Sequence, residues 1–227
     1  MKIANGVNMM TLTSDFTGHQ MTIHPTLVWD EDHVILVDTG MPGMAEQIRT
    51  EMEKAGVPFD KLTTVVLTHQ DFDHIGGLPD IIQQSNNSIE VIAHEADKPY
   101  IEGEKLLMKM DRDRAEKMAP PKAKVDKTVA DQEELPYCGG IRVIYTPGHT
   151  PGHISLYLEN SKTLITGDAI VSENGRLIGP NPQFTPDMAL ALQSIKKFAA
   201  YDIQSVICYH GGLCTNNVNQ QLRDLVK

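Results

Sequence analysis

The sequence has few cysteines and no long apolar run. Cys138, Cys208 and Cys214 form an odd set without the spacing of a disulfide framework, which favours free thiols and a reducing compartment. No apolar stretch approaches the about 18–20 residues that a membrane span needs. The first ten residues carry one lysine and no apolar segment, so they do not resemble a secretory signal. We therefore expect a cytoplasmic protein without a membrane partner.

The chain also lacks an excess of positive charge. Its formal net charge is −10, with 20 basic and 30 acidic residues. Proteins that bind nucleic acid place clustered Lys and Arg against the phosphate backbone, so nucleic acid is not an expected partner. The hydrophobic fraction of 41% is ordinary for a globular protein. A small-molecule substrate is the expected partner, and the sequence leaves a homodimer open.

Strands and helices alternate along most of the chain. Methionine or isoleucine at positions 44, 48 and 52 predicts a helix over roughly 44–55, with Gly56 as its C-cap. Further helices are expected at 78–84 and 187–199, between short β-branched runs that are typical of strands. This alternation indicates an α/β protein built in layers. No stretch has the composition of a domain linker, so we predict one domain over residues 1–227.

Residues 97–135 interrupt this alternation. They are rich in Lys, Asp and Glu, carry methionines at positions 108, 110 and 118, and contain Pro120-Pro121. We predict a helical insertion here, followed by an extended connection. Its part 105–118 fits either a packed helix face or a lid over the substrate, and the sequence leaves both open.

The most informative segment is residues 65–77, VVLTHQDFDHIGG. A short β-branched run ends at Thr68 and is followed within six positions by four side chains that can bind metal, namely His69, Asp71, Asp73 and His74. They cannot all be buried without partners, because an unpaired buried charge is strongly destabilising. A pair of divalent cations would satisfy all four. Gly76 and Gly77 are expected to let the backbone turn tightly away from the cluster.

Four further His or Asp residues each come just after another predicted strand. They are Asp38, His149, Asp168 and His210. Ligands and catalytic groups of layered α/β proteins gather at strand ends, where loops converge. We therefore expect these residues to lie at the same site as the first four.

Taken in order, the motifs LVDTG, THQDFDHIGG, TPGHTPGH, TGD and YHGG resemble those of the metallo-β-lactamase superfamily, and they extend from Asp38 to Gly212. The resemblance implies an αββα sandwich with two metal ions in a cleft at one edge of the sheets. It implies a first metal held by His69, Asp71 and His149, a second held by Asp73, His74 and His210, and Asp168 bridging both. A hydroxide between the metals would be the nucleophile.

One residue departs from the family pattern. The family usually has a histidine where this chain has Asp71, whereas the related flavodiiron proteins, which hold iron, carry a glutamate there. The substitution adds a negative charge, so three carboxylates and two divalent ions leave a net charge of +1, or zero with a bridging hydroxide. Harder oxygen ligands move the preference from zinc toward iron or manganese. Zinc is the metal that the family implies, and Asp71 keeps iron and manganese open.

Several residues near these motifs have weaker assignments. Asp38 is expected to orient a ligand histidine through its other ring nitrogen, with a purely structural turn as the alternative. His153 is expected to have a structural or supporting role, and His94 to lie at the sheet edge near the cleft. Cys208 is expected to act as a small buried apolar residue. Tyr100 is the candidate for a catalytic hydroxyl that stabilises an oxyanion.

The leading hypothesis is a metal-dependent hydrolase of a small ester, thioester or lactone. The metals would polarise the carbonyl, and Asp73 or a metal-held water would pass a proton to the leaving group. The alternative from another class is a di-iron redox protein that reduces oxygen or nitric oxide with a separate electron donor. A third alternative is a metal-stabilised binding protein without turnover.

Overall fold

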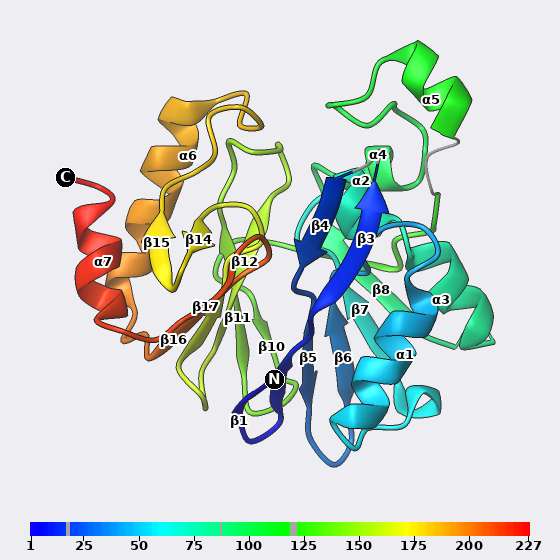
Figure 1. Ribbon diagram of the computed structural model, residues 1–227, viewed down its shortest axis with the longest axis horizontal. Coiled ribbons are helices and arrows are strands. Elements are labelled where there is room, and N and C mark those ends of the chain that lie inside the picture. The colour runs from blue at the N-terminus through cyan, green and yellow to red at the C-terminus, as the bar shows by residue number, and fades with distance from the viewer. Residues whose placement is uncertain (17–18, 87, 119–121) are drawn as a thin grey trace.

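The computed structural model describes residues 1–16, 19–86, 88–118 and 122–227. The predicted connection at Pro120-Pro121 lies outside these ranges. The first sheet has the strand order β1-β2-β5-β6-β7-β8-β9 and the second has the order β10-β11-β12-β13-β16-β17. The two sheets pack face to face, and helices cover their outer faces (Figure 1).

The first sheet and its helices come from the first half of the chain. Its strands are β1 (Lys2–Ala4), β2 (Val7–Met9), β5 (Thr26–Trp29), β6 (Val34–Val37), β7 (Thr64–Val66), β8 (Glu90–His94) and β9 (Lys127–Val129). The helical elements of this half are α1 (Ala45–Lys54), η1 (Phe59–Lys61), α2 (Phe72–Ile75), α3 (Leu78–Gln84), α4 (Lys98–Ile101) and α5 (Arg112–Met118). A separate hairpin joins β3 (Leu12–Phe16) to β4 (His19–Ile23).

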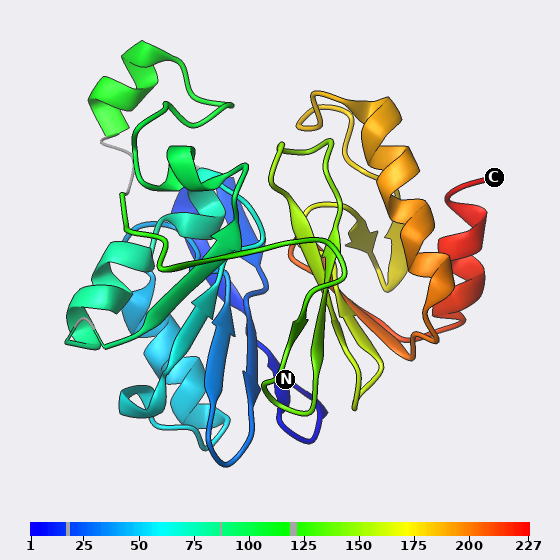
Figure 2. The same ribbon diagram turned by 180° about the vertical axis from the view of Figure 1, so that it is seen from behind.

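The second sheet is formed by the second half of the chain. Its strands are β10 (Glu134–Leu135), β11 (Ile141–Tyr145), β12 (Ile154–Leu158), β13 (Thr163–Ile165), β16 (Ser205–Cys208) and β17 (Gly212–Cys214). This half also contains a separate hairpin, formed by β14 (Val171–Glu173) and β15 (Arg176–Ile178). Its helical elements are α6 (Met188–Ile195), η2 (Lys196–Ala200) and α7 (Val218–Asp224). The chain passes from the first sheet to the second between β9 and β10 (Figure 2).

Three apolar clusters separate the four layers. The central one lies between the sheets and includes Ile35 and Val66 of the first sheet and Leu156 of the second. Alternate residues of the same strands face outward, so Leu36 packs with helix α1, and Leu164 packs with the α6 side of the second sheet. Strands covered on both faces are apolar along their whole length, which explains the continuously buried VILV of β6.

The main helices agree with the sequence prediction. Helix α1 covers nearly all of the predicted 44–55, and α3 spans the predicted 78–84. The predicted helix 187–199 is divided into α6 and the 3₁₀ turn η2. Residues 97–135 contain the short helices α4 and α5 and the strands β9 and β10. Within the described ranges, no helix is long and apolar enough to cross a membrane.

The glycines after the metal-capable cluster have a different role from the predicted one. Neither Gly76 nor Gly77 adopts a positive φ; their φ angles are −61° and −81°. Both are needed because the backbone passes very close to its neighbours. A Cβ atom on Gly77 would lie 2.2 Å from the carbonyl oxygen of Thr39, and one on Gly76 would lie 2.4 Å from Cδ of Pro42. Glycine here permits close packing instead of a tight turn.

Candidate metal centre

The topology of both sheets brings six strand ends to one edge of the sandwich. Strands β6, β7 and β8 are parallel, so the residues that follow them emerge at the same edge. In the second sheet, β11 and β13 are both antiparallel to β12, and β16 is parallel to β13, so these three strands also end together. The predicted convergence of His and Asp residues at strand ends is therefore present in the structure.

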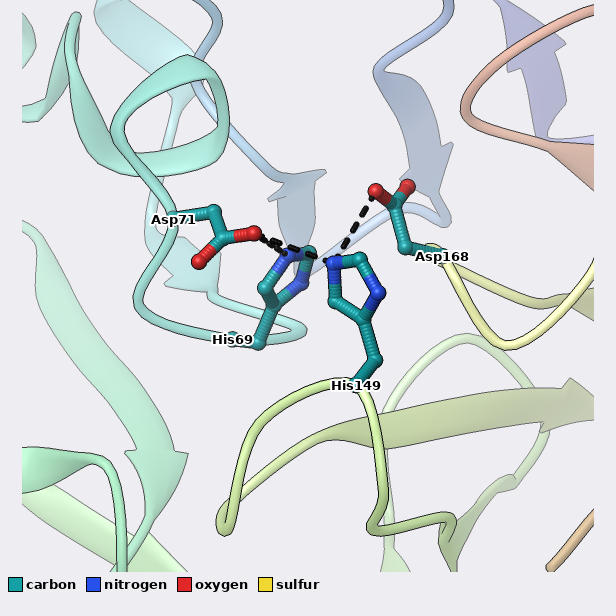
Figure 3. Close-up of side chains that lie close together, drawn as sticks. All are labelled: His69, Asp71, His149 and Asp168. Atoms are coloured by element: carbon teal, nitrogen blue, oxygen red, sulfur yellow. Dashed lines mark hydrogen bonds and ion pairs between the residues drawn. The ribbon is translucent and has the colours of Figure 1, made fainter. Parts of the chain in front are cut away.

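Four side chains form a first group at this edge (Figure 3). Oδ2 of Asp71 lies 3.3 Å from Nε2 of His69 and 3.0 Å from Nε2 of His149. Asp168 approaches from the opposite side, with Oδ2 3.3 Å from the same Nε2 of His149. His69 and His149 are buried, whereas Asp71 is partly exposed. The four potential ligand atoms all lie within 4.8 Å of one another.

A second group lies beside the first. It consists of Asp73 and His74 of helix α2 and His210, which follows β16. Oδ2 of Asp73 lies 3.2 Å from Nε2 of His210. Asp168 also faces this group, because its Oδ1 lies 3.3 Å from Nε2 of His74 and its Oδ2 lies 3.5 Å from Nε2 of His210. One carboxylate thus lies between the two groups.

The unpaired atoms of the site fit a pair of cations. Nε2 of His69, Nε2 of His74 and Oδ1 of Asp168 are buried and have no hydrogen-bond partner among the described residues. Buried polar atoms normally have hydrogen-bond partners, so three atoms without one in the same two groups indicate that a bound group completes the site. Imidazole nitrogens and carboxylate oxygens are the ligands of divalent transition metals. The residues therefore fit two divalent metal ions.

The histidines of the second group are strongly affected by the carboxylates. Burial alone would lower the pKa of His210, but Asp168 and Asp73 outweigh it and raise that pKa to about 10. Burial also opposes the charge on His74, but Asp168, Asp38 and Asp73 hold its pKa well above the ordinary value. The charged imidazoles compensate the carboxylates when no metal is bound. Metal ions would have to displace these protons.

The carboxylates show the reverse effect. Burial would raise the pKa of Asp71, but His69, other neighbouring histidines and Lys109 hold it well below the ordinary value. The pKa of Asp168 is also held well below its ordinary value, since its histidine neighbours, led by His210, outweigh burial. Both groups are therefore ionised at neutral pH and available as ligands.

Comparison with known proteins decides the family. The family model described as the metallo-beta-lactamase superfamily matches residues 22–210, which is most of the chain. The chain belongs to the metallo-β-lactamase superfamily. The predicted αββα sandwich is thereby confirmed, and the protein is a hydrolase of this superfamily.

Individual relatives agree with this assignment. The "Probable metallo-hydrolase YflN" of Bacillus subtilis is 30% identical over 199 residues, which cover 78% of this chain and 75% of that protein. An "N-acyl homoserine lactonase" of Bacillus thuringiensis is 29% identical over 204 residues, which cover 75% and 72%. The crystal structure of a metallo-beta-lactamase family protein from Thermus thermophilus has a TM-score of 0.77 at 22% identity, covering 99% of this chain and 79% of that one. That likeness concerns the fold.

Asp38 makes the contact that the sequence predicted for it. Its Oδ2 lies 2.9 Å from Nδ1 of His74, so the other ring nitrogen of His74 faces the site. Thr68 donates two hydrogen bonds to the same carboxylate, from its backbone N–H (2.8 Å) and its hydroxyl (2.7 Å). Because the carboxylate is fixed in this way, it orients the ring of His74. Carboxylates that hydrogen-bond to the second ring nitrogen of a metal-binding histidine commonly have this role.

The sequence analysis also singled out His153 and His94, and neither belongs to the two metal-capable groups. Nε2 of His153 accepts a hydrogen bond from the backbone N–H of Asp168 (3.0 Å), and its Nδ1 lies 2.8 Å from the hydroxyl of Thr146. His153 therefore holds the backbone of the residue that lies between the two groups. His94 stacks on the ring of Tyr145, with the ring centroids 4.3 Å apart.

Two further predicted residues lie in apolar surroundings. Cys208 is fully buried in the cluster beneath α6 and η2, as expected for a small apolar residue. Tyr100 lies in α4 and is partly buried against the cluster beneath the first sheet's helices, with Nζ of Lys105 5.3 Å from its ring centroid. A catalytic hydroxyl at Tyr100 stays a prediction.

Asp97 is the principal supporting residue that the sequence did not indicate. This fully buried carboxylate accepts hydrogen bonds from the backbone N–H (3.0 Å) and side-chain amide (2.9 Å) of Gln70, which lies between His69 and Asp71 of the first group. It also accepts bonds from the hydroxyl of Thr150 (2.7 Å) and the N–H of Gly152 (2.8 Å), in the loop that carries His149. Asp97 thus fixes two loops that carry metal-capable residues relative to each other.

Lys109 is the second residue that was not anticipated. It belongs to the 105–118 segment, and its ammonium lies 2.5 Å from Oδ2 of Asp71 and 2.6 Å from Nε2 of His149. The segment therefore reaches the first group. In the sequence, Lys109 is one of several lysines in a charged stretch, and no spacing distinguishes it from the others.

Proposed function

We propose that this protein hydrolyses a small carbonyl ester, in the form of a thioester or lactone, at a dinuclear metal site. The observation that carries the proposal is the position of Asp168, whose carboxylate oxygens lie within 3.5 Å of imidazole nitrogens from both groups. A shared carboxylate of this kind can hold two cations next to each other. Two adjacent cations suit the hydrolysis of a carbonyl ester.

Each group has a separate set of ligands in this proposal. His69, Asp71 and His149 would hold the first ion, Asp73, His74 and His210 would hold the second, and Asp168 would bind both. The ions would polarise the substrate carbonyl and supply a hydroxide at neutral pH. Asp73 is partly exposed, so its carboxylate is accessible to a leaving group and can carry a proton to it.

Exposed apolar residues that are adjacent in sequence to residues contacting the site support an acyl substrate. Met108 is 44% exposed and precedes Lys109, which contacts the first group. Phe184 is 52% exposed and precedes Thr185, whose hydroxyl lies 3.3 Å from Nδ1 of His149. Exposed large apolar side chains near a polar site favour a ligand with an apolar part. The lactonase of Bacillus thuringiensis is a relative whose name records a substrate of this class.

The ligand set influences which metal ion the site prefers. Zinc is the ion that the resemblance implies, but Asp71 gives the first group an additional hard oxygen ligand, which favours iron or manganese. Elemental analysis of protein purified without added metal tests this part. About two zinc or manganese ions per chain support the hydrolase, whereas two irons would favour a redox protein and call for an oxygen-consumption assay.

Activity requires a second measurement. We expect the metal-loaded protein to cleave members of a panel of acyl thioesters and lactones, and Asp168→Asn to lose most of that activity and part of the metal. Asp224→Asn, which changes a carboxylate on the surface helix α7, is the matched control and should behave as the wild type. A protein that takes up no metal after reloading, or that binds metal but cleaves no member of the panel, would contradict the proposal.

A further inference from the structure

The ammonium of Lys109 lies at the two atoms that would bind the first metal ion. Oδ2 of Asp71 and Nε2 of His149 face each other at 3.0 Å, and Nζ of Lys109 lies 2.5 Å from the former and 2.6 Å from the latter. A metal ion bound to these two atoms would compete for the same space and for the same lone pairs. It would also be repelled by the positive charge.

The backbone beside Lys109 is attached to the metal-capable motif itself. The N–H of Met108 donates a hydrogen bond to Oε1 of Gln70 (2.9 Å), and the amide of Gln70 is held in turn by Asp97. On either side, Leu107 and Met110 are buried in the cluster beneath the first sheet's helices. The segment thus has a fixed place next to the first group, and the position of the ammonium follows from these contacts.

The second group has a different environment. Within the described part of the chain, the ion pairs of Asp73 involve only His74 and His210. Asp71, in contrast, pairs with a lysine that is only 24% exposed. The aspartate at position 71 and Lys109 together are neutral, like the histidine that the family usually has there. The two groups therefore differ in the cation beside the carboxylate. In the second group it is an imidazole, which becomes a metal-capable side chain when it loses its proton, whereas in the first group it is the ammonium of Lys109, which a metal ion would have to displace.

We propose that Lys109 is an internal competitor of the first metal ion, and that the two groups consequently load in order, the second group first and more tightly. The inference rests on the proposed use of both groups as metal sites. Binding at the first group displaces the ammonium from Asp71 and His149. Lys109 thereby sets the affinity and the occupancy of the first ion.

The test is a titration of the metal-free protein with zinc, in which the affinity of each binding step is measured by calorimetry and by competition with a chromophoric chelator. We expect two separate binding steps in the wild type. In Lys109→Met, which keeps the length of the side chain and removes the charge, the weaker step should tighten by about tenfold, the lower end of the effect that neighbours of metal ligands have on affinity. Lys109→Arg keeps the charge and should keep the two steps apart.

Lys105→Met is the matched control. Lys105 lies in the same segment, is exposed, and faces Tyr100 instead of the metal groups. Its replacement should leave both steps unchanged. A second control uses the Asp71→His background, in which the ammonium has lost its carboxylate partner. There, the effect of Lys109→Met on the first step should become much smaller.

The outcomes separate this inference from the proposed function. Equal zinc affinities in wild type and Lys109→Met, with two ions bound to each, would overturn the competitor role and leave the dinuclear hydrolase intact. Equal tightening in Lys105→Met would also overturn it, because the effect would then arise from the net charge of the segment. No zinc binding by any variant would overturn both proposals.

Discussion

Oδ2 of Asp38 lies 2.9 Å from Nδ1 of His74, and this contact determines which nitrogen of the imidazole faces the second metal group. Because a carboxylate only accepts hydrogen bonds, Nδ1 of His74 carries the proton and Nε2 is directed to the site. Asp38 itself has a positive φ of 62°, which is uncommon outside glycine and places its side chain toward Thr68 and His74.

Asp38→Asn should weaken metal binding at the second group. Asparagine tolerates the positive φ, so the backbone should be retained. Its NH₂ group cannot accept the hydrogen bonds that both carboxylate oxygens now receive, and the orientation of His74 is lost. We expect an affinity loss of about 10- to 100-fold, the range for partners of metal ligands. Zinc competition measures it, and near-UV circular dichroism checks the fold. Unchanged affinity would contradict the orienting role.

Asp97→Asn should lower both stability and metal affinity. The buried carboxylate accepts four hydrogen bonds, and asparagine would leave at least one of the donors without an acceptor. Such a loss costs roughly 1–3 kcal/mol in the free energy of unfolding. Urea unfolding of the metal-free protein measures the first effect. Glu53→Gln, an exposed change on α1, is the control and should change neither quantity.

The metal-free protein should become less stable as the pH rises above neutrality. The pKa of His210 is raised to about 10 in the folded state, against about 6.5 in the unfolded chain. Its contribution is therefore complete below about pH 6.5 and is lost as the pH rises toward 10. Urea midpoints in the presence of a chelator at pH 6.5, 8 and 9.5 should fall in that order. His210→Gln should flatten this dependence, and an equally steep fall in that variant would exclude His210 as its cause.

Two thiols should be unreactive in the folded protein. Burial, aided by Asp30 at Cys138, raises the pKa of both Cys138 and Cys208 to about 12. Since the thiolate is the reactive form, we expect both to react slowly with a disulfide reagent at pH 8. In denaturant, all three cysteines of the chain should react rapidly. Mass spectrometry after labelling identifies the sites, and rapid native labelling of Cys138 would contradict the prediction.

The sequence predicted those parts of the molecule that have a local signal. Apolar spacing located α1 and α3, and the order of the motifs gathered all seven metal-capable residues at one edge. The helical turn α2, which carries Asp73 and His74, was not predicted, because four residues are too few to show a helical spacing of apolar side chains. Gly76 and Gly77 were predicted to permit a tight turn, but the structure requires them for close contact with Pro42 and Thr39 much earlier in the chain, which no local pattern records.

The supporting residues were missed for the same physical reason. Asp97 contacts Gln70 and Gly152, which are 27 and 55 positions away in the chain. Lys109 is 38 positions from Asp71 and 40 from His149. A single buried aspartate or a single lysine has no periodicity, so its role depends on which loops the fold brings together.

The seven metal-capable residues are divided between the two sheets. His69, Asp71, Asp73 and His74 follow a strand of the first sheet, whereas His149, Asp168 and His210 follow strands of the second. Metal ions at this edge would cross-link the two halves of the sandwich, in addition to any role in hydrolysis. Each bound ion stabilises only the state in which the two sheets are packed together. Both halves should therefore unfold in one transition, and its midpoint should rise with metal concentration.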